Sequence, residues 1–330
     1  VAIVDRKQGG TTILAEKGYT VHTIFDIYEV FDALLDAQKI TAAQHASCLL
    51  FVQNNVSQKL PSNITSAKEK LDVPSYQKRS EKAQHQVSKR LLNIMTNKQT
   101  NLVFSADVTD AATLLTLADK LGPHICMLKT HVDIVTNADD AFIKQLKQTA
   151  EKHNFLLLED RKFGDIGNTM RAQFVGGAHK IATWADAVTT HVIAGASSIE
   201  ALQKTPYAHT VGVIIIAQMS TKDTLTDENY RKKAAAIAEK YKNQVIGLVS
   251  QQRLTNDLGL LQFTPGVNLA SKDDADGQVY NTPDAAFAKR GADVIIVGRG
   301  IYKANNPLQA AIAYKEAGWM AHQNRLEVTV

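Results

Sequence analysis

Cysteine, long apolar runs and an excess of one charge sign are all scarce in this sequence, and each shortage excludes a class of protein. The two cysteines, Cys48 and Cys126, form no CxxC pair, so the sequence predicts neither a disulfide framework nor a zinc site. The longest apolar runs, such as residues 211–217, fall far short of the roughly 20 residues that span a bilayer. The first thirty residues also lack the basic-then-apolar pattern of a secretory signal. We therefore expect a cytoplasmic protein with no membrane partner.

Charge and composition are those of an ordinary globular protein. The chain has 330 residues, with 37 Lys and Arg against 33 Asp and Glu, which gives a formal net charge of +4 with the histidines neutral. Nucleic-acid-binding proteins usually carry a larger excess of basic residues, so no nucleic-acid partner is expected. A hydrophobic fraction of 45% and a charged fraction of 21% are typical of a folded core and exclude a disordered or collagen-like chain.

The amino-terminal end has too few elements for a domain of its own. Residues 1–4 and 20–24 are predicted strands, and apolar residues between Ile27 and Leu35 recur at the spacing of one helix face. Two strands and one helix cannot enclose a core, so residues 1–55 are predicted to be the α/β remnant of an upstream domain, with a cut end at Val1. Residues 56–80, a polar stretch interrupted by prolines, are predicted to be a linker.

From residue 81 to residue 330 a single domain is predicted, in which β-rich runs alternate with helical segments. This alternation implies a parallel sheet, and eight strands in about 230 residues fit a closed (β/α)₈ TIM barrel better than an open doubly wound sheet. The GxGxxG turn typical of that alternative is absent after the first strand. The predicted strands are residues 102–107, 125–130, 155–159, 187–192, 211–217, 245–249, 262–265 and 294–298, and the predicted helices include 111–121, 139–153, 227–241, 283–289 and 306–317.

Polar residues gather where the predicted strands end. In a barrel of this kind the active site lies at the carboxyl ends of the strands, so charges of alternating sign at several ends predict one electrostatic site. At the last strand, two glycines around an arginine are typical of a phosphate site, because free backbone N–H groups and a bidentate guanidinium both bind a dianion. The residues are Ser105 and Asp107, Lys129 and His131, the segment 159–162, and Gly298, Arg299 and Gly300.

The segment EDRKFGDIGNT, at residues 159–169, is the most informative in the chain. It resembles the signature of the orotidine 5′-phosphate decarboxylase family, which has Asp, Lys and Asp at the spacing of Asp160, Lys162 and Asp165. Blocks at residues 105–107, 127–131, 219–220, 261–267, 277–280 and 297–300 also resemble that family, in order. The resemblance extends from about residue 80 to the end of the chain. Residues 4–10 and the following helix resemble the end of the orotate phosphoribosyltransferase domain in bifunctional UMP synthases, whose pyrophosphate-binding signature is absent here.

The resemblance implies decarboxylation of orotidine 5′-monophosphate to uridine 5′-monophosphate in de novo pyrimidine biosynthesis, without a metal or organic cofactor. It assigns a catalytic charge array to Lys129, Asp160, Lys162 and Asp165, with Lys162 protonating C6 and Asp165 supplied by the partner in a homodimer. Fixed charge suits this reaction, because the electron pair left at C6 has no adjacent carbonyl, imine or cofactor into which it can delocalise. Substrate contacts are implied for Ser105, Asp107, Ile166, Thr169, Met219, Ser220, Pro265, Gln278, Tyr280, Gly298 and Arg299.

Two other functions are compatible with parts of the pattern. Metal-dependent sugar-phosphate epimerases and synthases use similar barrels and a similar terminal phosphate site, and His131 and His191 would be available as metal ligands. A hydrogen-bonded packing role is nevertheless the simpler expectation for both histidines. A non-catalytic binding module is the least favoured alternative, since Lys129, Asp160, Lys162 and Asp165 are all present.

Overall fold

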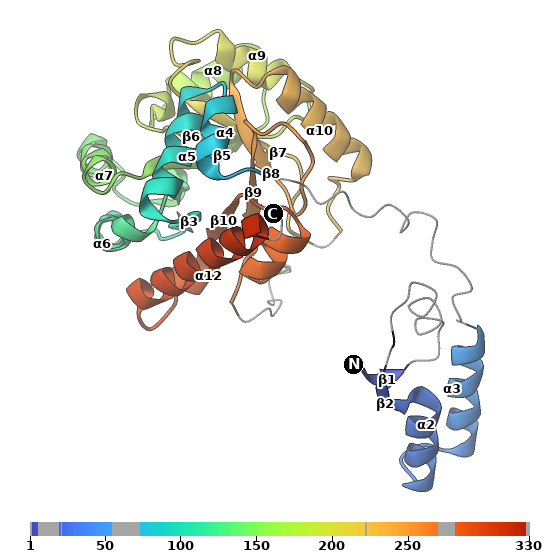
Figure 1. Cartoon of the computed structure of the whole chain (residues 1–330). Helices are drawn as coiled ribbons and strands as arrows, with labels where there is room; N and C mark the ends of the chain where they lie inside the picture. The colour runs from blue at the N-terminus through green and yellow to red at the C-terminus, as the bar shows by residue number, and fades with distance from the viewer. Residues whose placement is uncertain are drawn as a thin grey trace. The chain divides into compact units, whose positions relative to one another are not determined.

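The computed structural model describes residues 2–5, 20, 22–54, 73–221, 223–269 and 281–327. The chain divides into two compact units, Val1–Leu71 and Asp72–Val330 (Figure 1). Within the described ranges, no helix combines the length and the apolar character that crossing a membrane requires.

The amino-terminal unit contains two short parallel strands followed by two helices. The strands are β1 (Ala2–Asp5) and β2 (Thr23–Asp26), and the helices are α2 (Ile27–Asp36) and α3 (Ala42–Asn54). Asp26 begins α2 with a capping box, because its carboxylate accepts from the backbone N–H of Glu29 while the Glu29 side chain accepts from the N–H of Asp26. Both predicted strands and the predicted helix are present, although the second strand begins three residues later. Helix α3 has no counterpart in the sequence prediction.

Eight parallel strands close into a barrel in the second unit (Figure 1). Their order is β10-β3-β4-β5-β6-β7-β8-β9, so consecutive strands are neighbours and the last pairs with the first. Each corresponds to a predicted strand, and the predicted (β/α)₈ barrel is confirmed. The strands are β3 (Leu102–Ser105), β4 (Met127–Thr130), β5 (Leu156–Phe163), β6 (Ala187–Thr190), β7 (Gly212–Ile216), β8 (Val245–Val249), β9 (Leu261–Pro265) and β10 (Val294–Val297).

Helices alternate with these strands and surround the barrel (Figure 1). Three of the predicted helices, now α6, α7 and α10, agree with the structure to within one residue at each end. Helix α7 is capped by Asp139, whose carboxylate accepts from the backbone N–H of Phe142 at 2.8 Å. The helices are α4 (Tyr76–Lys82), α5 (Gln86–Lys98), α6 (Ala111–Leu121), α7 (Asp140–His153), α8 (Gly167–Val175), α9 (Ser197–Gln203), α10 (Glu228–Lys240), a π-helical turn at Ala285–Lys289, α11 (Arg299–Tyr302) and α12 (Pro307–Glu327).

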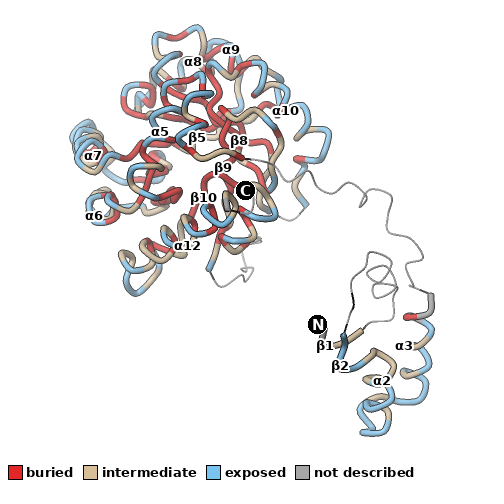
Figure 2. The backbone as a smooth tube through the Cα atoms, viewed as in Figure 1, coloured by how far each residue is buried: buried red, intermediate tan, exposed pale blue. Residues whose placement is uncertain are grey.

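Strand side chains divide between two cores. Figure 2 shows the strands of the barrel unit as buried. Because successive side chains of a strand point to opposite faces, Val103 lies inside the barrel while Leu102 and Phe104 pack against the surrounding helices. Residues of α5, including Leu91 and Leu92, belong to the interior core. Helix α5 therefore closes the amino-terminal end of the barrel and leaves the carboxyl ends of the strands open.

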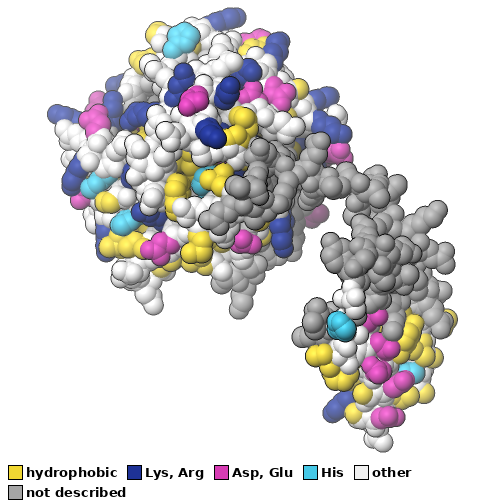
Figure 3. Space-filling model, in the orientation of Figure 1, with side chains coloured by type: hydrophobic (Ala, Val, Ile, Leu, Met, Phe, Trp, Pro, Cys, Tyr) yellow, Lys and Arg dark blue, Asp and Glu magenta, His cyan; other side chains and the backbone are white. Residues whose placement is uncertain are grey.

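The surface of the barrel unit carries both signs of charge. On the face in Figure 3, Lys and Arg side chains are interspersed with Asp and Glu. Among the described residues of this unit, six large apolar side chains are exposed, and five of them lie in loops that follow strands. Those five are Ile134, Ile166, Ile193, Leu225 and Leu269, with exposures from 42% to 94%.

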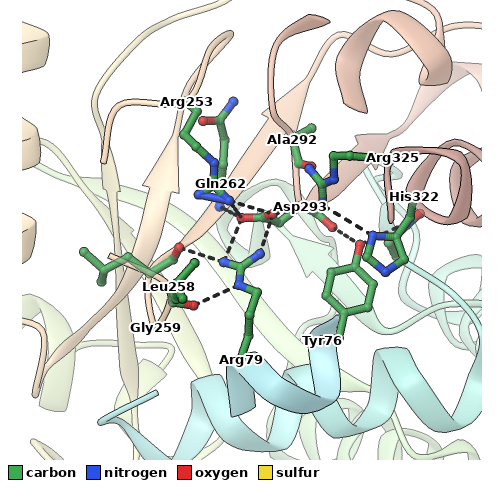
Figure 4. Close-up of polar contacts among 12 residues, drawn as sticks. Tyr76, Arg79, Arg253, Leu258, Gly259, Gln262, Ala292, Asp293, His322 and Arg325 are labelled. Atoms are coloured by element: carbon green, nitrogen blue, oxygen red, sulfur yellow. Dashed lines mark hydrogen bonds and ion pairs between the residues drawn. The ribbon is translucent and has the colours of Figure 1, made fainter. Parts of the chain in front are cut away.

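A buried ion cluster fastens α4 to the start of β10 (Figure 4). The two terminal nitrogens of Arg79 lie 2.5 and 3.0 Å from the carboxylate oxygens of Asp293, and neither side chain has any exposed surface. Arg253 and Arg325 approach the same carboxylate at 3.1 and 3.5 Å. Burial alone would raise the pKa of Asp293, but the three guanidinium groups outweigh it and hold this pKa well below its usual range.

This cluster corrects the predicted end of the linker. The sequence prediction extends the linker to residue 80, whereas Tyr76 and Arg79 are buried in the barrel unit, which begins at Asp72. The Tyr76 hydroxyl donates to the carbonyl of Asp293 at 2.8 Å, and its ring stacks on His322 with centroids 3.8 Å apart. The acceptors of the Tyr76 hydroxyl and of the Arg79 guanidinium lie at least 179 residues later, so local polarity gave no sign of their burial.

Candidate active site

A cavity of about 260 Å³ opens at the carboxyl ends of the strands. All eight strands of the barrel contribute to its lining, as expected for an active site in this fold. Ten of the predicted site residues line it: Ser105, Asp107, Lys129, Asp160, Lys162, Met219, Ser220, Pro265, Gly298 and Arg299. The sequence prediction missed Thr189 and Gln218, which also line it.

Strand alternation explains why these side chains reach the cavity. Met127 and Leu158 are in the interior core, so the residues two positions later, Lys129 and Asp160, also point inward. Glu159 points the other way and is fully buried outside the barrel, where its carboxylate accepts from the Thr130 hydroxyl at 2.7 Å. Burial raises the pKa of Glu159 to about 7. Two adjacent carboxyl groups thus occupy different environments, and only Asp160 faces the cavity.

Asp160 is the centre of a compact charge cluster. Its Oδ2 lies 2.9 Å from Nζ of Lys129, 2.7 Å from Nζ of Lys162 and 3.3 Å from Nε2 of His131. Its Oδ1 accepts a hydrogen bond from the Thr189 hydroxyl at 2.8 Å. One carboxylate therefore holds two ammonium groups at the floor of the cavity.

The environment of this cluster keeps its central ion pair charged. Burial alone would lower the pKa of Lys129, but the carboxylates of Asp160 and Asp107 outweigh burial and raise it. Burial alone would raise the pKa of Asp160, but Lys129, His131 and Lys162 hold it well below its usual range. The raised pKa of Lys129 and the lowered pKa of Asp160 both favour a charged ammonium beside a charged carboxylate near neutral pH.

Asp107 and His131 extend the cluster along β3 and β4. Asp107 Oδ1 accepts from the Ser105 hydroxyl at 2.8 Å and from Nζ of Lys129 at 3.2 Å. The ring of His131 lies 2.9 Å from Nζ of Lys129, so this histidine contacts the charged groups directly. The sequence favoured a packing role for it, because a histidine two residues after a strand-end lysine gives no local sign of its contacts.

Lys162 lies at an irregularity in β5. The pairing of β5 with β6 shifts register between Glu159 and Phe163, and Lys162 has a left-handed φ of +50°. A residue with a side chain rarely adopts this conformation, which costs of order 1–3 kcal/mol unless its surroundings hold it. Lys162 lies two residues after Asp160 and so on the same inward face of β5, and its Nζ lies 2.7 Å from Asp160 Oδ2.

The last strand provides the other end of the cavity. Gly298 directly follows β10, and a Cβ added there would lie 3.3 Å from Oδ2 of Asp107, so glycine lets the chain pass close to the charge cluster. A Cβ at Gly300 would collide with the hydroxyl and ring of Tyr314. Arg299, between the two glycines, lines the cavity and begins the short helix α11. A guanidinium beside tight glycine turns is an arrangement that binds phosphate.

Gln218, Met219 and Ser220 form the wall that follows β7. The side-chain oxygen of Gln218 accepts from the backbone N–H of Gln251 at 3.2 Å, and the N–H of Met219 donates to the Thr226 hydroxyl at 3.1 Å. These bonds hold the segment after β7 beside the cavity. Every second side chain of a strand points to the same face, so counting in twos from the interior Ile214 would also have predicted Gln218 as a cavity residue.

Five predicted residues are not placed among the lining residues. Ile166 and Thr169 are exposed at the start of α8, and Asp165 is half-buried beside them and is not part of the cavity wall. Gln278 and Tyr280 lie outside the described residues. Across the part of the chain that is described, no group of three or more His, Cys, Asp and Glu side chains has the geometry to hold a metal ion.

Comparisons with known proteins agree with this geometry. The model of the family described as "Orotidine 5′-phosphate decarboxylase / HUMPS family" matches residues 100–314. A uridine 5′-monophosphate synthase of Bos taurus is 39% identical over 331 residues, which cover 99% of this chain and 69% of the relative. An orotidine 5′-phosphate decarboxylase of Aspergillus fumigatus is 44% identical over 268 residues, which cover 76% of this chain and 96% of the relative.

A solved structure shares the fold. The orotidine 5′-monophosphate decarboxylase of Methanocaldococcus jannaschii, complexed with the inhibitor BMP, matches with a TM-score of 0.52 and 22% identity. The match covers 66% of this chain and 98% of that one. At this level of identity the comparison supports the closed barrel.

Proposed function

The chain belongs to the orotidine 5′-phosphate decarboxylase / HUMPS family, and on this premise we propose that it decarboxylates orotidine 5′-monophosphate to uridine 5′-monophosphate in pyrimidine biosynthesis. One observation carries the proposal: Lys129, Asp160 and Lys162 form an alternating-charge array at the floor of a cavity that also contains Arg299. The comparisons do not favour the metal-dependent epimerase or synthase as an alternative.

The chemistry requires fixed charge at one carbon. When the bond between C6 and the carboxylate breaks, CO₂ leaves and its bonding electron pair remains on C6. An ammonium already in place stabilises this charge without reorganising at the moment of reaction. In the proposal, Lys162 Nζ stabilises the electron pair and then transfers a proton to C6, and the resulting amine regains a proton from water.

The other residues of the cavity bind and orient. Asp160 holds both lysines charged and aimed, and Asp107 with Ser105 provides acceptors on the β3 side, where we place the ribose. Arg299 with Gly298 is assigned to the 5′-phosphate, and Ser220 to the pyrimidine edge. The phosphate does not react, but its binding energy can help to position the ring against the charge array. Gln278 and Tyr280 stay proposed as phosphate contacts, and Met219 and Pro265 as contacts of the base.

The proposed active form is a homodimer with composite sites. Three features support it: Asp165, Ile166 and Thr169 do not line their own cavity, Gly167 turns the chain with a φ of +54°, and five exposed apolar side chains lie in loops after the strands. A second copy of the chain would cover these loops and place Asp165 near the partner's charge array. Residues 1–55 stay assigned to the end of an upstream transferase domain, and the reaction to the cytoplasm.

The activity is tested directly by the loss of orotidylate absorbance when the purified chain is mixed with orotidine 5′-monophosphate and a chelator. Turnover that survives chelation is the expected result, with uridine 5′-monophosphate and CO₂ formed in equal amounts. Absence of turnover by the folded protein would refute the proposed function. Turnover that stops on chelation and returns with a divalent metal would favour the metal-dependent alternative.

The composite site has its own test. Lys162→Ala and Asp165→Ala should each be inactive alone, because each removes a group that every site needs. In a mixed dimer one site carries both lesions and the other carries neither, so subunit exchange should restore activity toward one wild-type site per mixed dimer. If mass spectrometry shows exchange and activity does not return, Lys162 and Asp165 belong to the same subunit's site.

A further inference from the structure

Thr189 lies on β6, directly opposite the bulge that carries Lys162. Glu159 pairs with Val188 and Phe163 pairs with Thr190, so three residues of β5 face the single residue Thr189. A bulge of this kind interrupts the backbone ladder and leaves groups without their regular partners. The side chain of Thr189 supplies a partner at this position.

The hydroxyl of Thr189 joins the two central groups of the charge array. It accepts a hydrogen bond from the backbone N–H of Lys162 at 2.9 Å and donates one to Oδ1 of Asp160 at 2.8 Å. One hydroxyl proton and two lone pairs satisfy both bonds at once. Thr189 is only 1% exposed and lines the cavity, so water does not readily replace it in this role.

Each bond fixes one element of the geometry. The bond from Lys162 stabilises a left-handed backbone that otherwise costs free energy, and so sets the direction in which the ammonium leaves the strand. The bond to Asp160 occupies Oδ1 and directs Oδ2 toward Lys129 and Lys162. Resting on the proposed function, we infer that Thr189 is a positioning residue that aims Lys162 and Asp160 at the reacting carbon of the substrate.

The test compares the same substitution at two adjacent residues. Thr189→Val removes the bridging hydroxyl and nearly preserves the side-chain volume. Thr190→Val is the matched control, because the Thr190 hydroxyl is also buried but donates to the carbonyl of Phe163 at 3.1 Å and contacts neither charged residue. Thr189→Ser retains a hydroxyl and tests for rescue. Each variant is measured for kcat, for affinity for uridine 5′-monophosphate and for thermal unfolding.

We expect kcat of Thr189→Val to fall by about 10- to 100-fold, since a displacement of about 1 Å can cost that much in a positioned reaction. Affinity for uridine 5′-monophosphate should change by less than about threefold, because a displaced ammonium affects mainly the transition state. Thr189→Ser should recover most of the rate. Thr190→Val should lose stability without a comparable loss of kcat. If Thr189→Val folds poorly, Thr189→Ala removes the same hydroxyl without added bulk and is measured instead.

Three results would overturn the inference. The first is an unchanged kcat in a folded variant without the Thr189 hydroxyl, and the second is an equal loss of kcat in Thr190→Val. The third is a loss of product affinity as large as the loss of kcat. The wild-type assay separates this inference from the proposed function: no wild-type turnover refutes the function itself, whereas wild-type turnover with an unaffected Thr189→Val refutes only the positioning role.

Discussion

Replacing Asp160 with asparagine should convert a balanced charge array into a repulsive one. In the structure, Nζ of Lys129 and Nζ of Lys162 both lie within 3 Å of the same oxygen, Asp160 Oδ2. Asparagine keeps the size and the hydrogen-bonding shape of the side chain but removes its negative charge. The two ammonium groups would then face each other across a neutral amide.

The magnitude follows from the spacing. At an effective dielectric constant of about 20, two unit charges about 5 Å apart repel by roughly 3 kcal/mol. Because each 1.36 kcal/mol is a factor of about ten, the doubly protonated array becomes less favourable by about two powers of ten. Repulsion together with burial should therefore lower the pKa of Lys129, and kcat of Asp160→Asn should fall by at least about 100-fold.

The direction of the pH dependence is the sharper test. The carboxylates of Asp160 and Asp107 hold the pKa of Lys129 above its ordinary value. Loss of the Asp160 charge therefore lowers the pKa of Lys129, so that a larger fraction of the variant has both lysines protonated at lower pH. The kcat of Asp160→Asn should therefore rise as the pH falls, whereas the wild-type kcat should not. The assay measures kcat across the pH range in which both proteins stay folded, with Asp133→Asn, an exposed aspartate after β4, as the control. A loss of rate that is the same at every pH, or no loss, would refute the electrostatic argument.

Three other substitutions test separate parts of the molecule. Lys162→Ala should abolish turnover but leave the affinity for a nonreactive nucleotide largely intact, and equal losses in both would contradict its role in the transition state. Arg299→Ala should weaken binding of uridine 5′-monophosphate by about 10- to 150-fold relative to uridine, because a charge-assisted contact is usually worth about 1.5–3 kcal/mol. Equal losses of affinity for both ligands would show that Arg299 does not bind the phosphate. Asp293→Asn should lower the free energy of unfolding at neutral pH by about 3–5 kcal/mol, as expected when a buried ion cluster loses one partner. The pKa of Asp293 is depressed in the folded state, so the wild type should lose this contribution as the pH falls below the ordinary value of 3.8. As a control, Asp119→Asn removes the charge of a surface ion pair with Lys152 and should lower the free energy of unfolding far less than Asp293→Asn in chemical denaturation.

Most of the barrel was predictable because its strands are short apolar runs separated by helical periodicity. The strand ends of β3 and β4 indicated Ser105, Asp107 and Lys129 for a general reason, since the carboxyl ends of parallel strands meet at one mouth. The same reasoning, combined with the alternation of side chains along β7, would also have predicted Gln218 as a cavity residue. Local sequence was sufficient to predict these residues because the direction of each side chain depends only on its position in its own strand.

The remaining features depend on contacts between distant segments. The run from Leu156 to Phe163 gives no sign that β5 bulges, and it is at the bulge that Thr189 makes its two hydrogen bonds. The burial of Arg79 depends on Asp293, 214 residues later. Asp165 stays a prediction, because its assignment requires a second copy of the chain.

Each end of the barrel contains one aspartate surrounded by three basic side chains, but the two clusters differ in chemical capacity. At the closed end, Asp293 faces three arginines and is entirely buried. At the open end, Asp160 faces two lysines and a histidine, and the Lys162 side chain keeps 34% of its surface exposed. Arginine stays protonated in proteins and binds a carboxylate through a rigid fork, which suits a permanent fastening. Lysine can give up a proton and regain it, so the cluster that borders the cavity has the cations that proton transfer to a substrate carbon requires, and the other does not.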